Sequence, residues 1–133
     1  MYDVSFLKEQ LAIPKRVVVV MHARPDADAL GTSLALAFYL KDQAHRVTVI
    51  APTAYPLFLS WLPGVDEVII AENHTQEALL TQLGRIDLLF CVDFSLASRL
   101  EGLAFILKIA NCIKMVIDHH AEPEDFADFF FPW

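Results

Sequence analysis

The 133-residue sequence is poor in several residue types, and each shortage excludes a class of protein. Only two cysteines occur, Cys91 and Cys112, and both lie in apolar stretches without paired spacing. We therefore expect buried, reduced thiols and no disulfide or zinc chemistry. No run reaches the roughly 18 uninterrupted apolar residues of a spanning helix, and the N-terminus lacks the layout of an export signal. These shortages predict a soluble, cytoplasmic protein without a membrane partner.

Basic residues are also scarce. Ten Lys and Arg stand against seventeen Asp and Glu, which gives a formal net charge of -7. Such a surface disfavours long-range capture of long duplex nucleic acid. An anionic substrate would need a local source of attraction.

Hydrophobic residues are abundant, at 56% of the chain, and the mean hydropathy is +0.44. This length suits one domain, and this composition favours a sheet that is buried on both faces. Short β-rich runs alternate with helical patterns, as in repeated βαβ units. We predict a doubly wound α/β domain with a mainly parallel sheet of about five strands flanked by helices. The predicted strands begin at Arg16, Arg46, Glu67, Asp87 and Lys114, and the predicted helices cover about 4–12, 28–41, 75–84 and 96–111.

The chain ends on "FADFFFPW", with four aromatic residues in its last five positions. An independent domain does not normally leave so apolar a segment frayed at its terminus. We expect that the segment packs as a strand or that the polypeptide continues past Trp133.

Three of the predicted strands end in acids or histidines. In an open parallel sheet, ligands bind in the crevice at the carboxyl ends of the strands, where such residues from neighbouring strands meet. The segments are "VVVVMHARPDAD", "LLFCVD" and "KMVIDHH", and the residues that could share one pocket are His22, Asp26, Asp28, Asp93, Asp118, His119 and His120.

Electrostatics limits what such a pocket can contain. Two carboxylates about 5 Å apart repel by about 3 kcal/mol at an effective dielectric of 20. Either some of them are neutral or cations lie among them, and the imidazoles favour cations. Carboxylates and imidazoles without thiolates suit Mn²⁺ or Mg²⁺, with iron, cobalt and zinc as alternatives. Because the acids outnumber what one ion needs, we infer two cations, which would also attract a phosphoryl group.

The motifs "HARPDADALGTS", "CVDFS" and "IDHH" resemble the first three motifs of the DHH phosphoesterases in order and spacing. That family includes RecJ exonucleases, nanoRNases, cyclic-dinucleotide phosphodiesterases and manganese pyrophosphatases. The resemblance implies one Mn²⁺ held by His22, Asp26 and Asp93, and a second held by Asp28, Asp93 and His119. Asp93 would then bridge the two ions.

The resemblance also implies that His120 faces the substrate phosphate as a hydrogen-bond donor or proton source. Asp118 would orient an imidazole. Two residues depart mildly from the family pattern, because Ala27 stands where glycine is common and Thr32 where serine is common. A fourth aspartate and a C-terminal substrate domain, both typical of the family, would fall after Trp133. We therefore expect residues 1–133 to be an incomplete DHH catalytic domain that is weakly active or inactive alone.

Simpler interpretations apply to single residues. Asp26 or Asp28 alone would be interpreted as a helix N-cap, and Asp93 alone as a turn residue. His119 and His120 point in different directions along an extended chain, so one of them could be a bystander. His45 and His74 have no partner motif and are predicted to lie on the surface.

The motifs together predict a manganese-dependent phosphoesterase, with Mg²⁺ or Co²⁺ as alternative ions. It would act on phosphodiester or phosphomonoester bonds in short oligonucleotides or small nucleotides, as a nanoRNase does. Two alternatives stay open: an inorganic pyrophosphatase or exopolyphosphatase, and a non-catalytic nucleotide-binding module with a vestigial centre. The sequence does not determine the oligomeric state.

Overall fold

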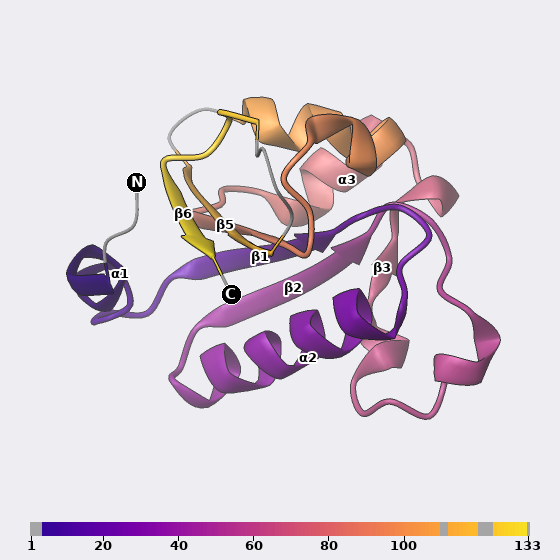
Figure 1. Ribbon diagram of the computed structural model, residues 1–133, viewed down its shortest axis with the longest axis horizontal. Helices are drawn as coiled ribbons and strands as arrows, with labels where there is room; N and C mark the ends of the chain where they lie inside the picture. Colours follow the sequence, from indigo (N-terminus) through magenta and orange to yellow (C-terminus); the bar gives the residue numbers. More distant parts are fainter. Residues whose placement is uncertain (1–3, 110–111, 120–123, 133) are drawn as a thin grey trace.

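The computed structural model describes residues 4–109, 112–119 and 124–132. Its centre is one six-stranded sheet in the order β3-β2-β1-β4-β5-β6, and each pair of neighbours is parallel (Figure 1). The predicted parallel α/β fold is therefore confirmed, with one more strand than the sequence indicated. The strands are β1 Arg16–Met21, β2 Arg46–Ala51, β3 Ile69–Ile70, β4 Leu88–Val92, β5 Ile113–Asp118 and β6 Phe129–Pro132.

Helices cover both faces of the sheet. Figure 1 shows α2 on one face, with α3 and the 3-10 segment η4 on the other. The α-helices are α1 Val4–Gln10, α2 Ala27–Asp42 and α3 Gln76–Leu83, and the 3-10 segments are η1 Leu57–Leu59, η2 Val65–Glu67, η3 Ala71–Asn73 and η4 Ala97–Lys108.

The valine run of β1 explains why this strand lies centrally. Val17 and Val19 pack into the core beneath α2, whereas Val18 and Val20 pack into the core beneath α3 and η4. Successive side chains of a strand point to opposite faces, so a strand covered on both sides must be apolar throughout. The run is therefore continuous because both of its faces are buried.

The strand order places a switch point between β1 and β4. The chain proceeds outward from β1 through β2 to β3, and then returns to build β4, β5 and β6 on the other side. At such a point the connections leave in opposite directions and open a crevice at the carboxyl ends of the strands. The motif residues that follow β1 and β4 therefore lie at the two strand ends that flank this switch point.

The C-terminal aromatic segment packs as a strand. Phe129 to Phe131 pair in parallel with β5, and the ring of Phe129 stacks on Phe6 of α1 with 4.3 Å between centroids. Pro132 closes this edge strand, a position that tolerates the loss of a backbone donor. Of the two expectations for this segment, packing as a strand is confirmed.

One local prediction holds with a difference in helix type, and one was wrong. The helical stretch expected over about 96–111 is present as the 3-10 segment Ala97–Lys108, which breaks at Glu101, where φ is 48° and ψ is -122°; positions 110–111 lie outside the described residues. Gly102 follows the break, and glycine weakens a helix interior. His45 was expected on the surface, but it is 4% exposed. It follows a turn at Ala44, which has a positive φ, and its Nδ1 accepts the backbone N–H of Lys15 at 3.0 Å.

The cysteines behave as predicted. Both are buried free thiols, and burial raises the pKa of Cys112 to about 11 and raises that of Cys91 as well. A thiol that stays protonated near neutral pH is a poor nucleophile and a poor metal ligand. Within the described part of the chain, no helix has the length and apolarity needed to cross a membrane.

Candidate metal centre

Strand register brings three motif residues into one row. Met21 pairs with Val92, and Val92 pairs with Ile117, so the ends of β1, β4 and β5 are aligned. The next residue on each strand is His22, Asp93 and Asp118 respectively. All three are buried. The sheet itself therefore assembles donors from segments up to 96 residues apart, the separation of His22 and Asp118.

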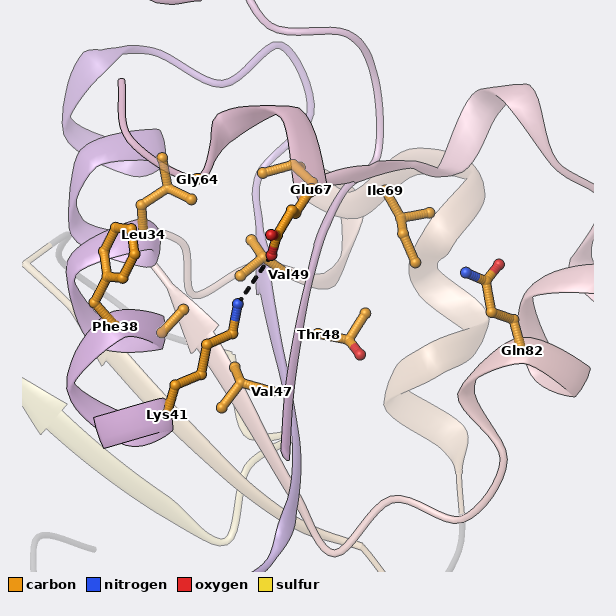
Figure 2. Close-up of a pocket in the computed structure, with 12 residues that line it drawn as sticks. Leu34, Phe38, Lys41, Val47, Thr48, Val49, Gly64, Glu67, Ile69 and Gln82 are labelled. Carbon is orange, nitrogen blue, oxygen red and sulfur yellow. Dashed lines mark hydrogen bonds and ion pairs between the residues drawn. The ribbon is translucent and has the colours of Figure 1, made fainter. Parts of the chain in front are cut away.

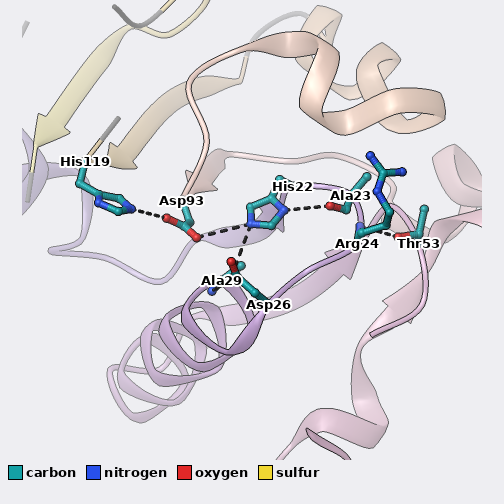
Figure 3. Close-up of polar contacts among 8 residues, drawn as sticks. All are labelled: His22, Ala23, Arg24, Asp26, Ala29, Thr53, Asp93 and His119. Atoms are coloured by element: carbon teal, nitrogen blue, oxygen red, sulfur yellow. Dashed lines mark hydrogen bonds and ion pairs between the residues drawn. The ribbon is translucent and has the colours of Figure 1, made fainter. Parts of the chain in front are cut away.

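His22 has a fixed orientation. Its Nδ1 lies 2.8 Å from the carbonyl oxygen of Ala23, and because a carbonyl only accepts, Nδ1 is the donor (Figure 3). The other ring nitrogen, Nε2, lies 3.8 Å from Oδ1 of Asp26 and 3.5 Å from Oδ2 of Asp93. A backbone hydrogen bond that sets the tautomer is the usual support of a metal-binding histidine.

Asp26 caps α2 and also faces the centre. Its backbone is extended, and Oδ1 accepts the N–H of Ala29 at 2.9 Å. The N-cap interpretation is therefore correct for Asp26, and it does not compete with a ligand role. The same carboxylate belongs to a group with His22 and Asp93 whose ligand atoms all lie within 4.8 Å of one another.

Asp93 connects the two halves of the centre. Its Oδ2 faces His22, and its Oδ1 lies 2.9 Å from Nε2 of His119. The residue has a φ of 63°, a left-handed conformation that is uncommon outside glycine, although asparagine and aspartate adopt it more readily than other residues. The backbone N–H of Asp93 donates to the carbonyl of Ile117, which holds this turn against β5. Unusual backbone geometry of this kind concentrates at functional sites.

Asp118 and His119 complete a second group with Asp93. Again the ligand atoms lie within 4.8 Å of one another. The resemblance implies that Asp118 orients an imidazole, and this role stays a prediction; its position also places a carboxylate oxygen among the candidate ligand atoms. Its strand-final place directly before His119 was the signal for that position. His119 is the more accessible donor, with its side chain 43% exposed.

Two predicted site residues lie outside these groups. Asp28 is on the exposed first turn of α2 and belongs to neither group, so it stays a predicted ligand. His120 lies outside the described residues, and its role also stays a prediction.

The donor geometry fits divalent cations. The gaps from His22 Nε2 to the two carboxylates, 3.5 Å and 3.8 Å, are too long for hydrogen bonds. Donors about 2.1 Å from an octahedral ion lie about 3.0 Å apart when adjacent and about 4.2 Å apart when opposite. Both observed gaps are below the distance between opposite donors, so one cation could contact Nε2 of His22 together with either carboxylate after small side-chain adjustments. Asp93 is common to both groups, which is the position that a bridging ligand requires.

Carboxylates and imidazoles gathered at the switch point of a parallel α/β sheet are a donor set that could hold divalent cations. Comparison with known proteins gives the family. The sequence model of the DHH family, N-terminal domain, matches residues 16–132, and the chain belongs to this family of phosphoesterases.

A solved structure supports the assignment. The chain resembles an exopolyphosphatase-related protein from Bacteroides fragilis with a TM-score of 0.88 and 31% sequence identity. The similarity covers 96% of this chain but 37% of that one. The chain thus spans little more than a third of that relative.

Proposed function

We propose that this chain carries the metal centre of a manganese-dependent phosphoesterase that hydrolyses phosphodiester or phosphomonoester bonds in nucleotides or short oligonucleotides. The observation that supports it most is the meeting of two donor groups at Asp93, at the sheet's switch point. Short cytoplasmic substrates of this kind are compatible with the net charge of -7. They do not need a basic surface, because the cations of the centre would attract the phosphate.

The residues have distinct roles in this proposal. His22, Asp26 and Asp93 would hold one cation, and Asp93, His119 and Asp28 or Asp118 the second. Two such cations supply an activated water and neutralise charge on a phosphoryl group. The Ala23 carbonyl keeps the free nitrogen of His22 aimed inward, and the cap to Ala29 keeps the carboxylate of Asp26 in place. His120 would donate a proton or hydrogen bond to the substrate.

A second candidate is hydrolysis of inorganic polyphosphate or pyrophosphate. It is favoured by the name of the B. fragilis relative, an exopolyphosphatase-related protein. Both candidates need the same centre, and they differ in what surrounds the reacting phosphoryl group. A nucleotide needs room for a base and a sugar beside the metals, whereas polyphosphate needs further cationic contacts.

A substrate comparison separates the candidates. The chain is loaded with Mn²⁺, Mg²⁺ or Co²⁺ and assayed against a 5′-phosphorylated diadenylate, pyrophosphate and medium-chain polyphosphate. We expect the diadenylate to be hydrolysed fastest, and Mn²⁺ to support the highest rate. Calorimetric titration of the metal-free chain with Mn²⁺ is expected to give two sites, and it reports on the centre even where turnover is slow.

The matched variants are Asp93→Asn and Asp66→Asn. Asparagine tolerates the left-handed backbone of Asp93, so this change removes a charge without adding strain, while Asp66 is exposed and remote from the centre. We expect Asp93→Asn to lose both Mn²⁺ sites and turnover, and Asp66→Asn to retain them. A chain that binds no Mn²⁺ after reconstitution would refute the enzyme proposal and favour a vestigial binding module. Faster cleavage of polyphosphate would favour the second candidate.

A further inference from the structure

Arg24 lies inside the first motif, two residues from each of the candidate ligands His22 and Asp26. Its backbone is held from outside the loop, because its N–H donates to Oγ1 of Thr53 at 2.6 Å. Its side chain is 74% exposed and pairs with Glu101 of η4. Figure 3 shows Arg24 and Thr53 on the far side of His22 from Asp93.

The pair joins two residues with unusual backbones. Arg24 has a φ of 52°, and Glu101 has a φ of 48° at the break in η4. Positive φ is costly for residues with large side chains. An ion pair this exposed returns little stability, because water and salt screen it. Backbone hydrogen bonds from Ala23 to Arg99 and from Arg24 to Thr53 hold the loop. The exposed side-chain pair therefore costs little to open, and a ligand can compete for either side chain.

A cavity of about 260 Å³ adjoins this ion pair, because Glu101 is one of its lining residues. Thr53 and Glu101, the two partners of Arg24, both line it. Thr53 follows the carboxyl end of β2, the strand next to β1, so the cavity opens on the same edge of the sheet as the metal centre. Arg24 stands between the two.

The lining of this cavity has two kinds of surface. Leu79, Leu103 and Phe105 supply apolar side chains, while Glu72 and Glu101 supply carboxylates. Oε2 of Glu72 already accepts the N–H of Ala54 at 2.7 Å, so Glu101 is the main acceptor for a ligand. Acidic acceptors repel a phosphate but match neutral donors such as ribose hydroxyls or a base amino group. A cation at the rim suits the phosphate that adjoins such a group. The cavity is thus matched to a nucleoside, and Arg24 to its phosphate.

We propose that this cavity is a nucleoside subsite of the metal centre, and that Arg24 exchanges its ion pair with Glu101 for the phosphate of the bound nucleotide. The released carboxylate of Glu101 then accepts a hydrogen bond from the sugar or base. Arg24 is a substrate-binding residue in this scheme. The inference rests on the proposed function, because it assigns where the substrate extends from the reacting phosphoryl group.

The second ion pair of the molecule at a cavity provides the matched control. Lys41 and Glu67 form an ion pair at 3.2 Å (Figure 2). Both line a second pocket, which lies between α2 and strands β2 and β3 and is also lined by Leu34 and Val47. This pocket adjoins the last turn of α2 and the first half of β2, away from the motif residues. Lys41→Gln therefore removes a paired surface cation without touching the proposed subsite.

Binding is measured by calorimetry on the 133-residue chain in EDTA, with AMP, adenosine and inorganic phosphate as probes. We expect Arg24→Gln to lower the affinity for AMP at least tenfold and to leave the affinity for adenosine within twofold of wild type. Glu101→Gln should tighten AMP severalfold, because Arg24 loses its competing partner. Lys41→Gln should change neither ligand. Equal AMP affinity in wild type and Arg24→Gln would overturn the proposal.

Amide shifts on AMP addition locate the ligand independently of affinity. We expect them at His74, Gln76 and Phe105, which line the cavity. Shifts confined to the pocket beside Lys41 would overturn the subsite. Nucleotide binding at this cavity in a chain that binds no Mn²⁺ after reconstitution would refute the proposed function alone. Hydrolysis of the diadenylate with an unchanged KM in Arg24→Gln would refute the subsite alone.

Discussion

His22 and His45 are equally buried, each 4% exposed, yet they lie at opposite ends of the sheet. His22 follows the carboxyl end of β1, and His45 precedes the amino end of β2. The Nδ1 of His22 donates to a carbonyl, so its Nε2 is left to face the carboxylates of Asp26 and Asp93. The Nδ1 of His45 accepts the N–H of Lys15, and no carboxylate is paired with this ring among the described contacts.

The difference teaches that burial does not identify a metal ligand. A backbone partner fixes each ring, but the partner's chemistry determines which nitrogen is available. In His22 the carbonyl partner occupies Nδ1 as a donor, so the lone pair of Nε2 faces the carboxylates. In His45 the N–H partner uses the lone pair of Nδ1, and this hydrogen bond holds a turn. One histidine can therefore serve an ion, and the other serves the fold.

The largest test of the contrast between His22 and His45 is at Asp93, the carboxylate shared by both donor groups. Asp93→Asn is expected to lower Mn²⁺ affinity at least about 100-fold, because neither group keeps its full charge. Mn²⁺ at 100 times its Kd should stabilise the wild-type chain by about 2.7 kcal/mol for each occupied site, and the variant by almost nothing. Thermal unfolding with Mn²⁺ and with EDTA measures both. An unchanged Mn²⁺-induced rise in the variant would contradict the assignment.

Asp26 allows the two roles of one carboxylate to be separated. Serine also caps helices, so Asp26→Ser should keep the free energy of unfolding in EDTA within about 0.5 kcal/mol of wild type. Mn²⁺ affinity should nevertheless fall about tenfold, because one ligand is gone. Asp26→Ala loses the cap as well and should cost about 1 kcal/mol more. If both variants bound Mn²⁺ as wild type does, Asp26 would be a cap only.

Sequence was sufficient where one physical rule governs an element. The valine run requires a strand covered on both faces, and acids after parallel strands must meet at one edge, so β1, β4, β5 and their terminal residues were predictable. Local pattern was insufficient where a distant partner decides. The break at Glu101 accompanies a pair with Arg24 that lies 77 positions away, and the burial of His45 depends on Lys15. The position of Asp118 among the ligand atoms follows from strand register, which no single motif contains.

The smallest expected effect on the metal centre comes from His45, and it sharpens the comparison. His45→Ala leaves the partly buried N–H of Lys15 unpaired and opens space where the buried ring lay, which should destabilise the chain by about 2 kcal/mol. His45→Asn places an amide oxygen near the position of Nδ1 and should recover much of that loss. Urea unfolding in EDTA measures the stabilities, and calorimetry measures Mn²⁺ binding, which neither variant should change.

Stability and ion binding must separate for the contrast between the two histidines to hold. His45 acts through a turn at the amino end of β2, whereas the donor groups form at the carboxyl ends of β1, β4 and β5. A loss of stability at the amino end of β2 should affect the donor groups only if the whole sheet unfolds. Mn²⁺ titration below the unfolding temperature avoids this global unfolding. A tenfold loss of Mn²⁺ affinity in His45→Ala, with the chain still folded, would show that the two ends are coupled and that the division of roles is wrong.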